Sequence, residues 1–383
     1  MTSGPTVDSI RSAVGAVSDP ELRLPLAELD MVRDISVEAG AARVGIVLTI
    51  IGCPAATRIE ADVRAAAASV PGVTSVEVEV GVMTPEERRA LTERLRGGRA
   101  ARTMPFGPGS LTRVIAVTSG KGGVGKCTVT ANMAIALARR GLSVGLVDAD
   151  VHGFSIPSLM GLAREGAIPS PTRIDDMMLP PIAHDVKVIS IGMFLRREGE
   201  SPTGAVAWRG PMLHRTIQQF LTDVYFGDLD VLLLDMPPGT GDIAITVGQL
   251  LPNAEVLVVT TPQSAASDVA VRSGLVARQT GQRLVGVVEN MAAMTLPDGS
   301  VFDLFGSGGG AEVAEALSTA DERVEVLASI PLSTVLRAGG DTGEPVLVAH
   351  PEDPAAVAIE RLATTLVATR RGLAGRSLPI TPR

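Results

Sequence analysis

The chain has 383 residues, of which 45% are hydrophobic, and it contains 41 glycines and 26 prolines. A chain of this length exceeds what one core usually serves, so we expect two globular domains rather than a disordered polymer. The formal net charge of −8 argues against nucleic acid or an anionic membrane as a partner, because both attract basic proteins.

The first segment combines helical and strand patterns. Apolar residues recur at helical spacing from Val7 to Val17, and Ser18-Asp19-Pro20 then ends the helix. Two strands, an alanine-rich helix and a third strand are predicted next, at Met31 to Glu38, Ala41 to Thr49, Ala55 to Ser69 and Val73 to Val80. Residues 1–84 are therefore predicted to form a small α+β domain of order α-β-β-α-β.

A change of composition separates this domain from the rest of the chain. Pro85 to Arg96 is charged and helical, and Gly97 to Ser110 collects Gly, Arg and Pro without an apolar period. We interpret residues 85–110 as a helical segment and a linker.

Residues 111–370 carry short β-branched runs separated by helical segments. The runs are Val114 to Val117, Ser143 to Val147, Val188 to Ile191, Val231 to Leu234, Val256 to Val259, Leu284 to Val288 and Val326 to Ser329. Continuous apolar strands that alternate with helices are typical of a buried parallel sheet. We expect an α/β domain with a mostly parallel sheet covered by helices on both faces, and a C-terminal tail at 371–383.

The first of these strands runs into a glycine-rich segment and then into a helical pattern from Thr128 to Arg140. Strand, glycine motif and helix in this order are the context of a P-loop, which disfavours a chance glycine-rich turn. Backbone N–H groups, the helix N-terminus and the Lys126 ammonium all offset phosphate charge there. The predicted nucleotide-binding residues are Gly120, Lys121, Gly122, Gly123, Val124, Gly125, Lys126, Cys127 and Thr128.

Lys121 is a second lysine near the start of the loop, and it is the mark of the deviant Walker A class. The segment thus resembles the MinD, ParA and nitrogenase-iron-protein ATPases. In that class the extra lysine reaches across a dimer interface to the partner's nucleotide, so the resemblance implies an ATP-favoured homodimer in which Lys121 and Lys126 are catalytic. The alternative is a solvated loop lysine.

Cys127 departs from the P-loop pattern, because this position normally carries a Ser or Thr whose hydroxyl binds Mg²⁺. A thiol is a poor ligand for a hard cation that requires oxygen donors. We therefore expect weakened Mg²⁺ binding and slow ATP hydrolysis.

Carboxylates follow two of the predicted strands. Asp148 and Asp150 lie where Ser143 to Val147 ends, at the edge of the sheet where ligands bind in open α/β folds. Resemblance to MinD-like ATPases implies that Asp150 orients the attacking water and that Asp148 lies near the metal; a helix cap is the alternative for this pair. Asp235 fits a Walker B metal group, and the loop after it fits a γ-phosphate-sensing switch II with residues Pro238, Gly239, Thr240, Gly241 and Asp242.

Two further residues are predicted to lie near the base. Asn290 follows the strand Leu284 to Val288, where an asparagine contacts adenine in the resembled family. Arg337 lies after Ile330-Pro331-Leu332, in the other segment expected near the base. A purely structural role is the alternative for both residues.

Together these motifs, with Trp208-Arg209-Gly210-Pro211-Met212 and Thr261-Pro262-Gln263, resemble those of Mrp/ApbC-type iron–sulfur cluster carriers. The N-terminal segments Asp19 to Leu22, Glu28 to Val32 and Gly52-Cys53-Pro54 are similar to the PaaD-like domain that precedes the ATPase in many bacterial members. The resemblance implies ATP, Mg²⁺ and an iron–sulfur cluster as ligands, and apoproteins as recipients of the cluster.

The cluster ligands are the point at which the chain departs from that family. The usual C-x-x-C pair is absent, because Met294 to Gly306 contains no sulfur ligand better than methionine. Cys53 is then the other candidate, in a turn ahead of a helix whose dipole is expected to lower the thiol pKa. A buried structural thiol is the alternative for Cys53.

Cys53 and Cys127 are the two cysteines of the chain, so no disulfide framework is indicated, and the N-terminus shows no secretion pattern. Apolar stretches such as Val44 to Ile51 are far shorter than the ~20 residues of a spanning helix. We expect a cytoplasmic protein without a membrane or nucleic-acid partner. Two other functions stay open: a MinD/ParA-like localisation ATPase, which the glycines and prolines of 369–383 disfavour, and a weakly hydrolysing ATP-binding scaffold.

Overall fold

The N-terminal segment forms the α-β-β-α-β unit predicted for it. Its two helices bury Ile10, Val14, Ile59 and Val63 against one face of a three-stranded sheet of order β1-β2-β3. Strands β1 and β2 pair antiparallel, and β2 and β3 pair parallel. The elements are α1 (Val7–Gly15), β1 (Val32–Glu38), β2 (Ala41–Leu48), α2 (Ala56–Ala68) and β3 (Ser75–Val82). In this computed structural model, residues 5–97, 103–150, 153–163, 167–194, 210–296 and 298–368 are described.

Helix α3 (Pro85–Leu95) belongs to the same core. Its N-terminus is fixed by a capping box between Thr84 and Glu87, and Leu91 is buried among the N-terminal apolar residues. Part of the segment interpreted as helix and linker is thus packed. The limits 1–84, 85–110, 111–370 and 371–383 stay predictions, and residues 98–102 and 369–383 lie outside the described part of the chain.

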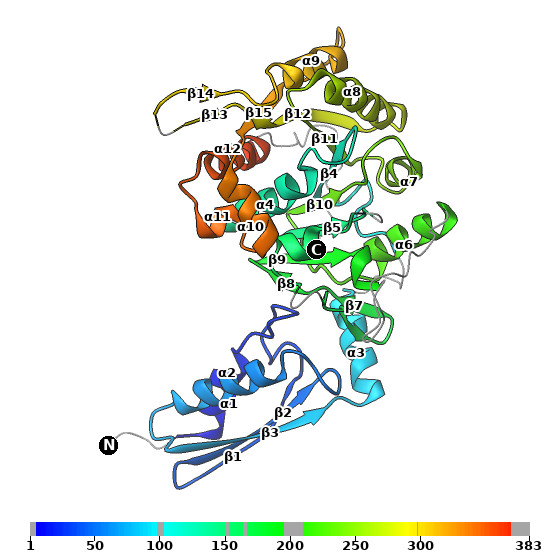
Figure 1. Cartoon of the computed structure of the whole chain (residues 1–383). Coiled ribbons are helices and arrows are strands. Elements are labelled where there is room, and N and C mark those ends of the chain that lie inside the picture. Colours follow the sequence, from blue (N-terminus) through cyan, green and yellow to red (C-terminus); the bar gives the residue numbers. More distant parts are fainter. Residues whose placement is uncertain are drawn as a thin grey trace.

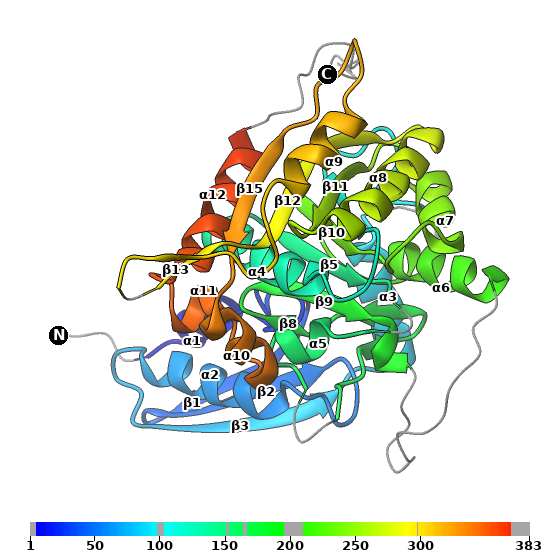
Figure 2. The same ribbon diagram turned by 45° about the horizontal axis from the view of Figure 1, so that its top comes forward.

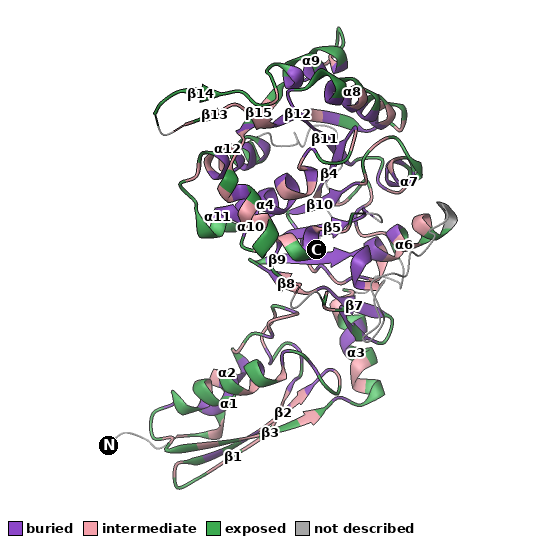
Figure 3. Ribbon diagram, viewed as in Figure 1, coloured by how far each residue is buried: buried purple, intermediate pink, exposed green. Residues whose placement is uncertain are grey.

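The second unit is built on an eight-stranded sheet of order β15-β12-β11-β4-β10-β5-β9-β8. All strands are parallel except β8, which pairs antiparallel with β9 at one edge. Figure 3 shows the central strands as buried, as their continuous apolar sequences predict. The strands are β4 (Arg113–Ser119), β5 (Val144–Asp148), β8 (Ile182–Ala183), β9 (Val186–Ser190), β10 (Val231–Asp235), β11 (Glu255–Thr260), β12 (Arg283–Ala292) and β15 (Val326–Pro331).

Helices cover both faces of this sheet, which confirms the predicted α/β architecture (Figures 1 and 2). Helices α4 and α12 pack together on one face, with α10 and α11 beside them; α6, α7, α8 and α9 lie on the other. The helices are α4 (Lys126–Arg139), α5 (Ile156–Leu159), α6 (Gly210–Thr222), α7 (Asp242–Leu250), α8 (Ser264–Gln279), α9 (Gly309–Leu317), α10 (Thr334–Thr342), α11 (Val346–Ala349) and α12 (Pro354–Ala368), with a 3₁₀ turn at Ile191–Phe194. No helix in the described ranges is both long and apolar enough to cross a membrane.

A small hairpin, β6 (Thr172–Ile174) and β7 (Met177–Leu179), joins the two units. Ile174, Met177 and Leu179 are buried in the N-terminal core although they belong to the second half of the chain. Across this contact, Thr172 donates a hydrogen bond to Glu21 at 2.7 Å. The two units therefore share apolar surface at the lower edge of the sheet (Figure 1).

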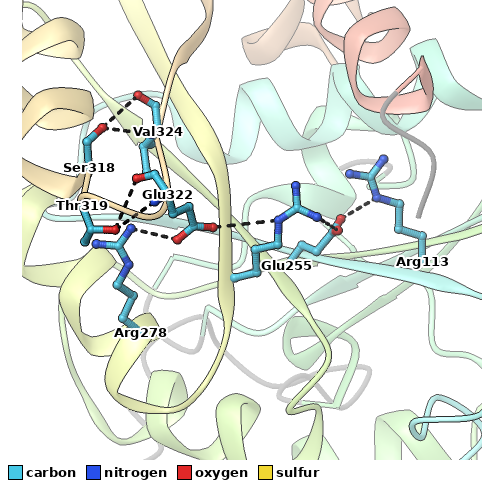
Figure 4. Close-up of polar contacts among 8 residues, drawn as sticks. Arg113, Glu255, Arg278, Ser318, Thr319, Glu322 and Val324 are labelled. Atoms are coloured by element: carbon cyan, nitrogen blue, oxygen red, sulfur yellow. Dashed lines mark hydrogen bonds and ion pairs between the residues drawn. The ribbon is translucent and has the colours of Figure 1, made fainter. Parts of the chain in front are cut away.

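An ion-pair network fixes the edge of the sheet at which the strands begin (Figure 4). The carboxylate of Glu255 lies 2.5 Å from Arg113 and 3.6 Å from Arg283, and it is only 4% exposed. Arg278 pairs with Glu322 at 3.0 Å in the same region. Strands β4, β11 and β12 are thus tied together at the edge opposite their carboxyl ends.

Candidate nucleotide site

The site forms where parallel strands end side by side. Asp235 at the end of β10 is in register with Asp148 at the end of β5 and with Val117 near the end of β4. Because carboxyl ends of parallel strands meet at one edge, the loops that follow these three strands converge. The glycine-rich loop and both predicted acidic loops therefore lie together.

The glycine-rich loop has the backbone that a phosphate cradle requires. Gly123 and Gly125 have φ values of 82° and 78°, in the left-handed region that favours glycine. Gly125 is the N-cap of α4, so the first N–H groups of this helix face the loop. A side chain at Gly120 would lie 2.3 Å from backbone atoms of α8, which explains glycine at that position.

These loops line a cavity of about 470 Å³. Its walls contain most of the predicted P-loop together with Asp150 and Pro238 from the two acidic loops. The lining residues are Ser119, Lys121, Gly122, Gly123, Val124, Gly125, Lys126, Cys127, Thr128, Asp150, Gly153, Ser155, Pro237 and Pro238. Residues predicted independently from separate motifs are thus brought into one cavity.

Lys126 is buried at the base of this cavity. Its Nζ lies 2.7 Å from Asp235 Oδ2 and 3.3 Å from Cys127 Sγ. Burial alone lowers the pKa of Lys126, but Asp235 and Cys127 outweigh burial, so the pKa lies above its ordinary value. The lysine is therefore a full positive charge in the wall of this cavity.

Asp148 and Asp235 are completely buried next to each other. The hydroxyl of Ser190 donates to Asp148 at 2.9 Å, and that of Thr130 donates to Asp235 at 2.9 Å. Burial, followed by repulsion from Asp235, raises the pKa of Asp148 well above its ordinary value. A bound cation would offset the repulsion between two adjacent buried carboxylates, so this pair is a candidate cation site.

Cys127 is the member of this group that does not suit magnesium. Burial, reinforced by the nearby Asp235 carboxylate, raises the pKa of the Cys127 thiol to about 12. A protonated thiol offers no oxygen to a cation that requires octahedral oxygen coordination. The carboxylates Asp148 and Asp235 fit Mg²⁺, whereas the Cys127 sulfur does not.

Asp150 and the loop after Asp235 supply the remaining polar groups. Asp150 lines the cavity and accepts a hydrogen bond from the Gly153 N–H at 3.1 Å. The Gly239 N–H donates to the Ser119 carbonyl at 2.8 Å, so the predicted switch II contacts the strand that precedes the P-loop. Its other members, Pro238, Thr240, Gly241 and Asp242, are exposed.

The two residues predicted to lie near the base differ in their positions. Asn290 is buried and donates its side-chain N–H to the Val124 carbonyl at 2.9 Å, so it holds the backbone of the P-loop in place. Arg337 is exposed on α10, pairs with Asp341 at 2.7 Å and does not line the described cavity. Contact of either residue with adenine stays a prediction.

Cys53 does not have the environment expected for it. The thiol is 7% exposed and lies 3.9 Å from Glu21 Oε2. Burial raises its pKa to about 11, which exceeds the opposing effect of the Ala55 N–H. The expectation of a lowered pKa is therefore wrong, because loss of hydration outweighs the helix terminus. Its role as a cluster ligand stays a prediction.

Sequence reasoning missed Thr130 and Ser190. Thr130 lies one helical turn after Lys126. The spacing of four residues in a helix was therefore a signal from which its position beside Lys126 could have been predicted. Ser190 ends β9, the neighbour of β5 in the sheet, and only the strand order shows that it faces Asp148. Trp208 and Arg209, which belong to one of the family motifs, lie outside the described residues.

The stretch Met294 to Gly306, which lacks a C-x-x-C pair, contains the hairpin β13 (Met294–Thr295) and β14 (Val301–Phe302). Val301, Phe302 and Leu304 are exposed there. Within the described ranges, no three His, Cys, Asp or Glu side chains form a group able to hold a metal ion by themselves.

Comparison with known proteins gives consistent results for both units. A family model described as "NUBPL iron-transfer P-loop NTPase" matches residues 110–367, and one described as "Iron-sulfur cluster assembly protein" matches residues 8–80. Among solved structures, a nucleotide-binding protein from Archaeoglobus fulgidus in complex with ADP is 34% identical with a TM-score of 0.51, covering 63% of this chain and 90% of that one.

Curated relatives match over nearly the whole chain. A Mycobacterium tuberculosis protein named iron-sulfur cluster carrier protein is 54% identical over 377 residues, which cover 98% of this chain and 96% of the relative. A Synechocystis protein of the same name is 38% identical over 360 residues, which cover 94% of this chain and 96% of the relative.

Proposed function

The chain belongs to the iron-transfer P-loop NTPase family, and from this premise we propose that it is an ATP-binding and ATP-hydrolysing carrier that binds iron–sulfur clusters and passes them to apoproteins. The observation that carries the proposal is the cavity that joins Lys121, Lys126 and Asp150. It occurs in a chain that aligns over 98% of its length with a cluster carrier.

The residues around the cavity have separate parts in binding and hydrolysis. The N–H groups at the start of α4 and the Lys126 ammonium bind phosphate oxygens. Asp150 faces the same cavity and orients the attacking water. A divalent cation, when bound near Asp148 and Asp235, neutralises charge that develops on the phosphates.

The proposal includes a cytoplasmic homodimer in which Lys121 acts on the partner's nucleotide. Lys121 lines the cavity and is partly exposed, so it lies at the surface where a second copy can meet it. ATP placed between two copies favours the dimer by mass action, because it binds the paired state more tightly than the single chains.

The cluster is the cargo of this carrier, and the two cysteines of the chain restrict where it can bind. The chain has two cysteines, and Cys127 lies in the nucleotide site. Cys53 is buried beside Glu21, which is tied to Thr172 of the ATPase unit. Cluster binding at Cys53 would therefore require this contact to open and other ligands to come from a partner or a small thiol.

Anaerobic purification followed by iron and acid-labile sulfide analysis tests the proposal. We expect iron and sulfide in similar amounts, transfer to an apo-ferredoxin, and a dimer by size measurement with ATP. Protein that binds ATP but neither holds nor transfers a cluster would contradict carriage and leave the ATPase assignment intact.

A second candidate, a weakly hydrolysing ATP-binding scaffold, is favoured by one observation, the half-buried Cys127 thiol at the metal position. The rate of ATP hydrolysis distinguishes the hydrolysing carrier from the scaffold. If ATP hydrolysis falls to background in Asp150→Ala, the site is catalytic, whereas equal rates in parent and variant would support the scaffold. The localisation ATPase stays an alternative, and the tail that bears on it lies outside the described residues.

A further inference from the structure

The ammonium group of Lys126 marks a cation position inside the nucleotide site. Its Nζ lies 2.7 Å from Asp235 Oδ2 and 3.3 Å from Cys127 Sγ. A carboxylate oxygen and a sulfur atom therefore face one common point, between the end of β10 and the start of α4. When a bound phosphate attracts the lysine, this point becomes accessible to another cation.

The groups around that point are held in place. Asp235 is completely buried, and the Thr130 hydroxyl binds its Oδ1 at 2.9 Å, which aims Oδ2 at the lysine. Asp148 adds a second carboxyl group in register with it. Among the described residues, no three His, Cys, Asp or Glu side chains form a complete metal site. An ion at this point therefore also needs oxygen ligands from the nucleotide.

Sulfur changes which ion this set of donors prefers. Mg²⁺ demands oxygen ligands at about 2.0–2.1 Å and loses its water reluctantly. Thiolate ligands instead favour softer transition ions, and Zn²⁺ accepts sulfur, carboxylate oxygen and a variable outer ligand in one site. The donors here, the Cys127 sulfur, whose thiol proton is released to solvent when the ion binds, and the Asp235 oxygen, belong to this mixed type.

We propose that the nucleotide site of this chain prefers a thiophilic divalent ion of the Co²⁺ and Zn²⁺ class to Mg²⁺, and that the Cys127 sulfur sets this preference. The inference rests on the proposed nucleotide-binding function, since phosphate oxygens complete the coordination. A serine at position 127 would provide a hydroxyl oxygen and restore the preference for Mg²⁺.

Cobalt provides a test that does not depend on turnover. Cys53→Ser leaves Cys127 as the sole thiol, and Cys53→Ser with Cys127→Ser is the matched control. Anaerobic titration with Co²⁺ in the presence of a non-hydrolysable ATP analogue is followed by thiolate-to-cobalt charge-transfer absorption. Affinity for a fluorescent ATP analogue is measured in parallel with Co²⁺ and with Mg²⁺.

We expect a charge-transfer band that requires nucleotide, saturates at one cobalt per chain and is absent from the control. In the Cys53→Ser protein, which retains Cys127, Co²⁺ should increase the affinity for the ATP analogue about tenfold more than Mg²⁺ does. In the Cys53→Ser, Cys127→Ser control, Mg²⁺ should increase this affinity more than Co²⁺ does. Nucleotide binding without the band, or a band that persists in the control, would overturn the metal preference alone. Loss of nucleotide binding in the parent would overturn the proposed function as well.

Discussion

Lys126 and Asp235 form a buried ion pair, 2.7 Å between Nζ and Oδ2, at the junction of the P-loop and the central strand β10. The lysine proposed to bind phosphate and the carboxylate proposed to bind a cation thus neutralise each other in this structure. An unpaired buried charge is strongly destabilising, so we expect a bound phosphate to replace Asp235 as the partner of the lysine. On the proposed function, nucleotide binding would therefore free Asp235 to bind a cation.

We predict that Asp148→Asn stabilises the nucleotide-free protein at neutral pH. The pKa of Asp148 is raised by burial and by Asp235, so the folded state retains a proton that the unfolded chain releases above its ordinary carboxyl pKa. This contribution to stability is complete at low pH and is lost as the pH rises through the folded-state pKa. Asp148→Asn lacks that loss, so its free energy of unfolding at neutral pH should exceed that of the parent by about 1 kcal/mol or more.

Urea unfolding of parent and variant between pH 4 and pH 8 measures this effect. The two free energies of unfolding should converge toward the acidic end and separate toward the alkaline end, while ATP turnover falls in the variant. A parent protein that gains stability over the variant as the pH rises would contradict the prediction.

Asn290→Ala should weaken ATP binding without direct contact with ATP. The Asn290 side chain holds the Val124 carbonyl at 2.9 Å, and its loss leaves a buried carbonyl without that donor. If this loss destabilises the ordered conformation of the loop by about 1–2 kcal/mol, the affinity for ATP falls roughly 5–30-fold. Gln282→Ala, which truncates a buried amide at the start of the sheet, is the control. Equal ATP affinity of the parent and Asn290→Ala would refute a supporting role.

Mixing two inactive variants tests whether Lys121 acts across the dimer. Lys121→Ala and Asp150→Ala are each expected to lose turnover. In a mixed dimer, the site with intact Asp150 receives Lys121 from the partner, so an equal mixture should recover about one quarter of parental turnover. If the lysine serves its own nucleotide, both sites of the mixed dimer lack one group and the mixture stays inactive.

The fold and much of the site follow from the sequence because they depend on local signals. Every main strand of the parallel sheet was predicted, since a buried strand is continuously apolar. The P-loop, Asp150 and Asp235 were located because glycines and strand-terminal carboxylates mark the carboxyl edge of the sheet. In the structure most of the P-loop and Asp150 line one cavity, and Asp235 lies 2.7 Å from Lys126 in its wall, in agreement with that reasoning.

What the sequence did not predict depends on contacts between distant segments. The β6–β7 hairpin is too short to show a period, and its burial against the N-terminal core requires the assembled structure. The lowered pKa expected for Cys53 was wrong for the same reason: the helix terminus is visible in the sequence, whereas burial of the thiol, the alternative interpretation, depends on the assembled core. Ser190 became a site residue only through the neighbouring positions of β5 and β9.

Cys53 should react slowly with alkylating reagents. With its pKa raised to about 11 by burial, its thiolate fraction at pH 8 is about two orders of magnitude below that of a free cysteine, whose pKa is about 8.5. Timed alkylation in a Cys127→Ser background, read by mass spectrometry, measures this. Thr172→Val, which removes the hydroxyl bound to Glu21, should raise the rate. A rate equal to that of a free thiol would show that Cys53 is accessible.

Glu255→Ala should destabilise the second unit, which is built on the eight-stranded sheet, by about 3–5 kcal/mol, because it leaves the mostly buried Arg113 guanidinium without its carboxylate. Glu255→Gln retains a hydrogen-bond acceptor and should be less damaging. Glu325→Ala removes the exposed partner of Arg323, 3.9 Å away, and should change stability by less than about 1 kcal/mol.

Urea unfolding followed by circular dichroism compares the three variants, and ATP affinity is measured on the folded fraction. Because Glu255 lies at the edge of the sheet where the strands begin, away from the P-loop, folded Glu255→Ala protein should bind ATP as the parent does. Equal losses of stability in Glu255→Ala and Glu325→Ala would mean that the buried network contributes no more than a surface pair. The sheet would then be held by its apolar strands and hydrogen bonds alone.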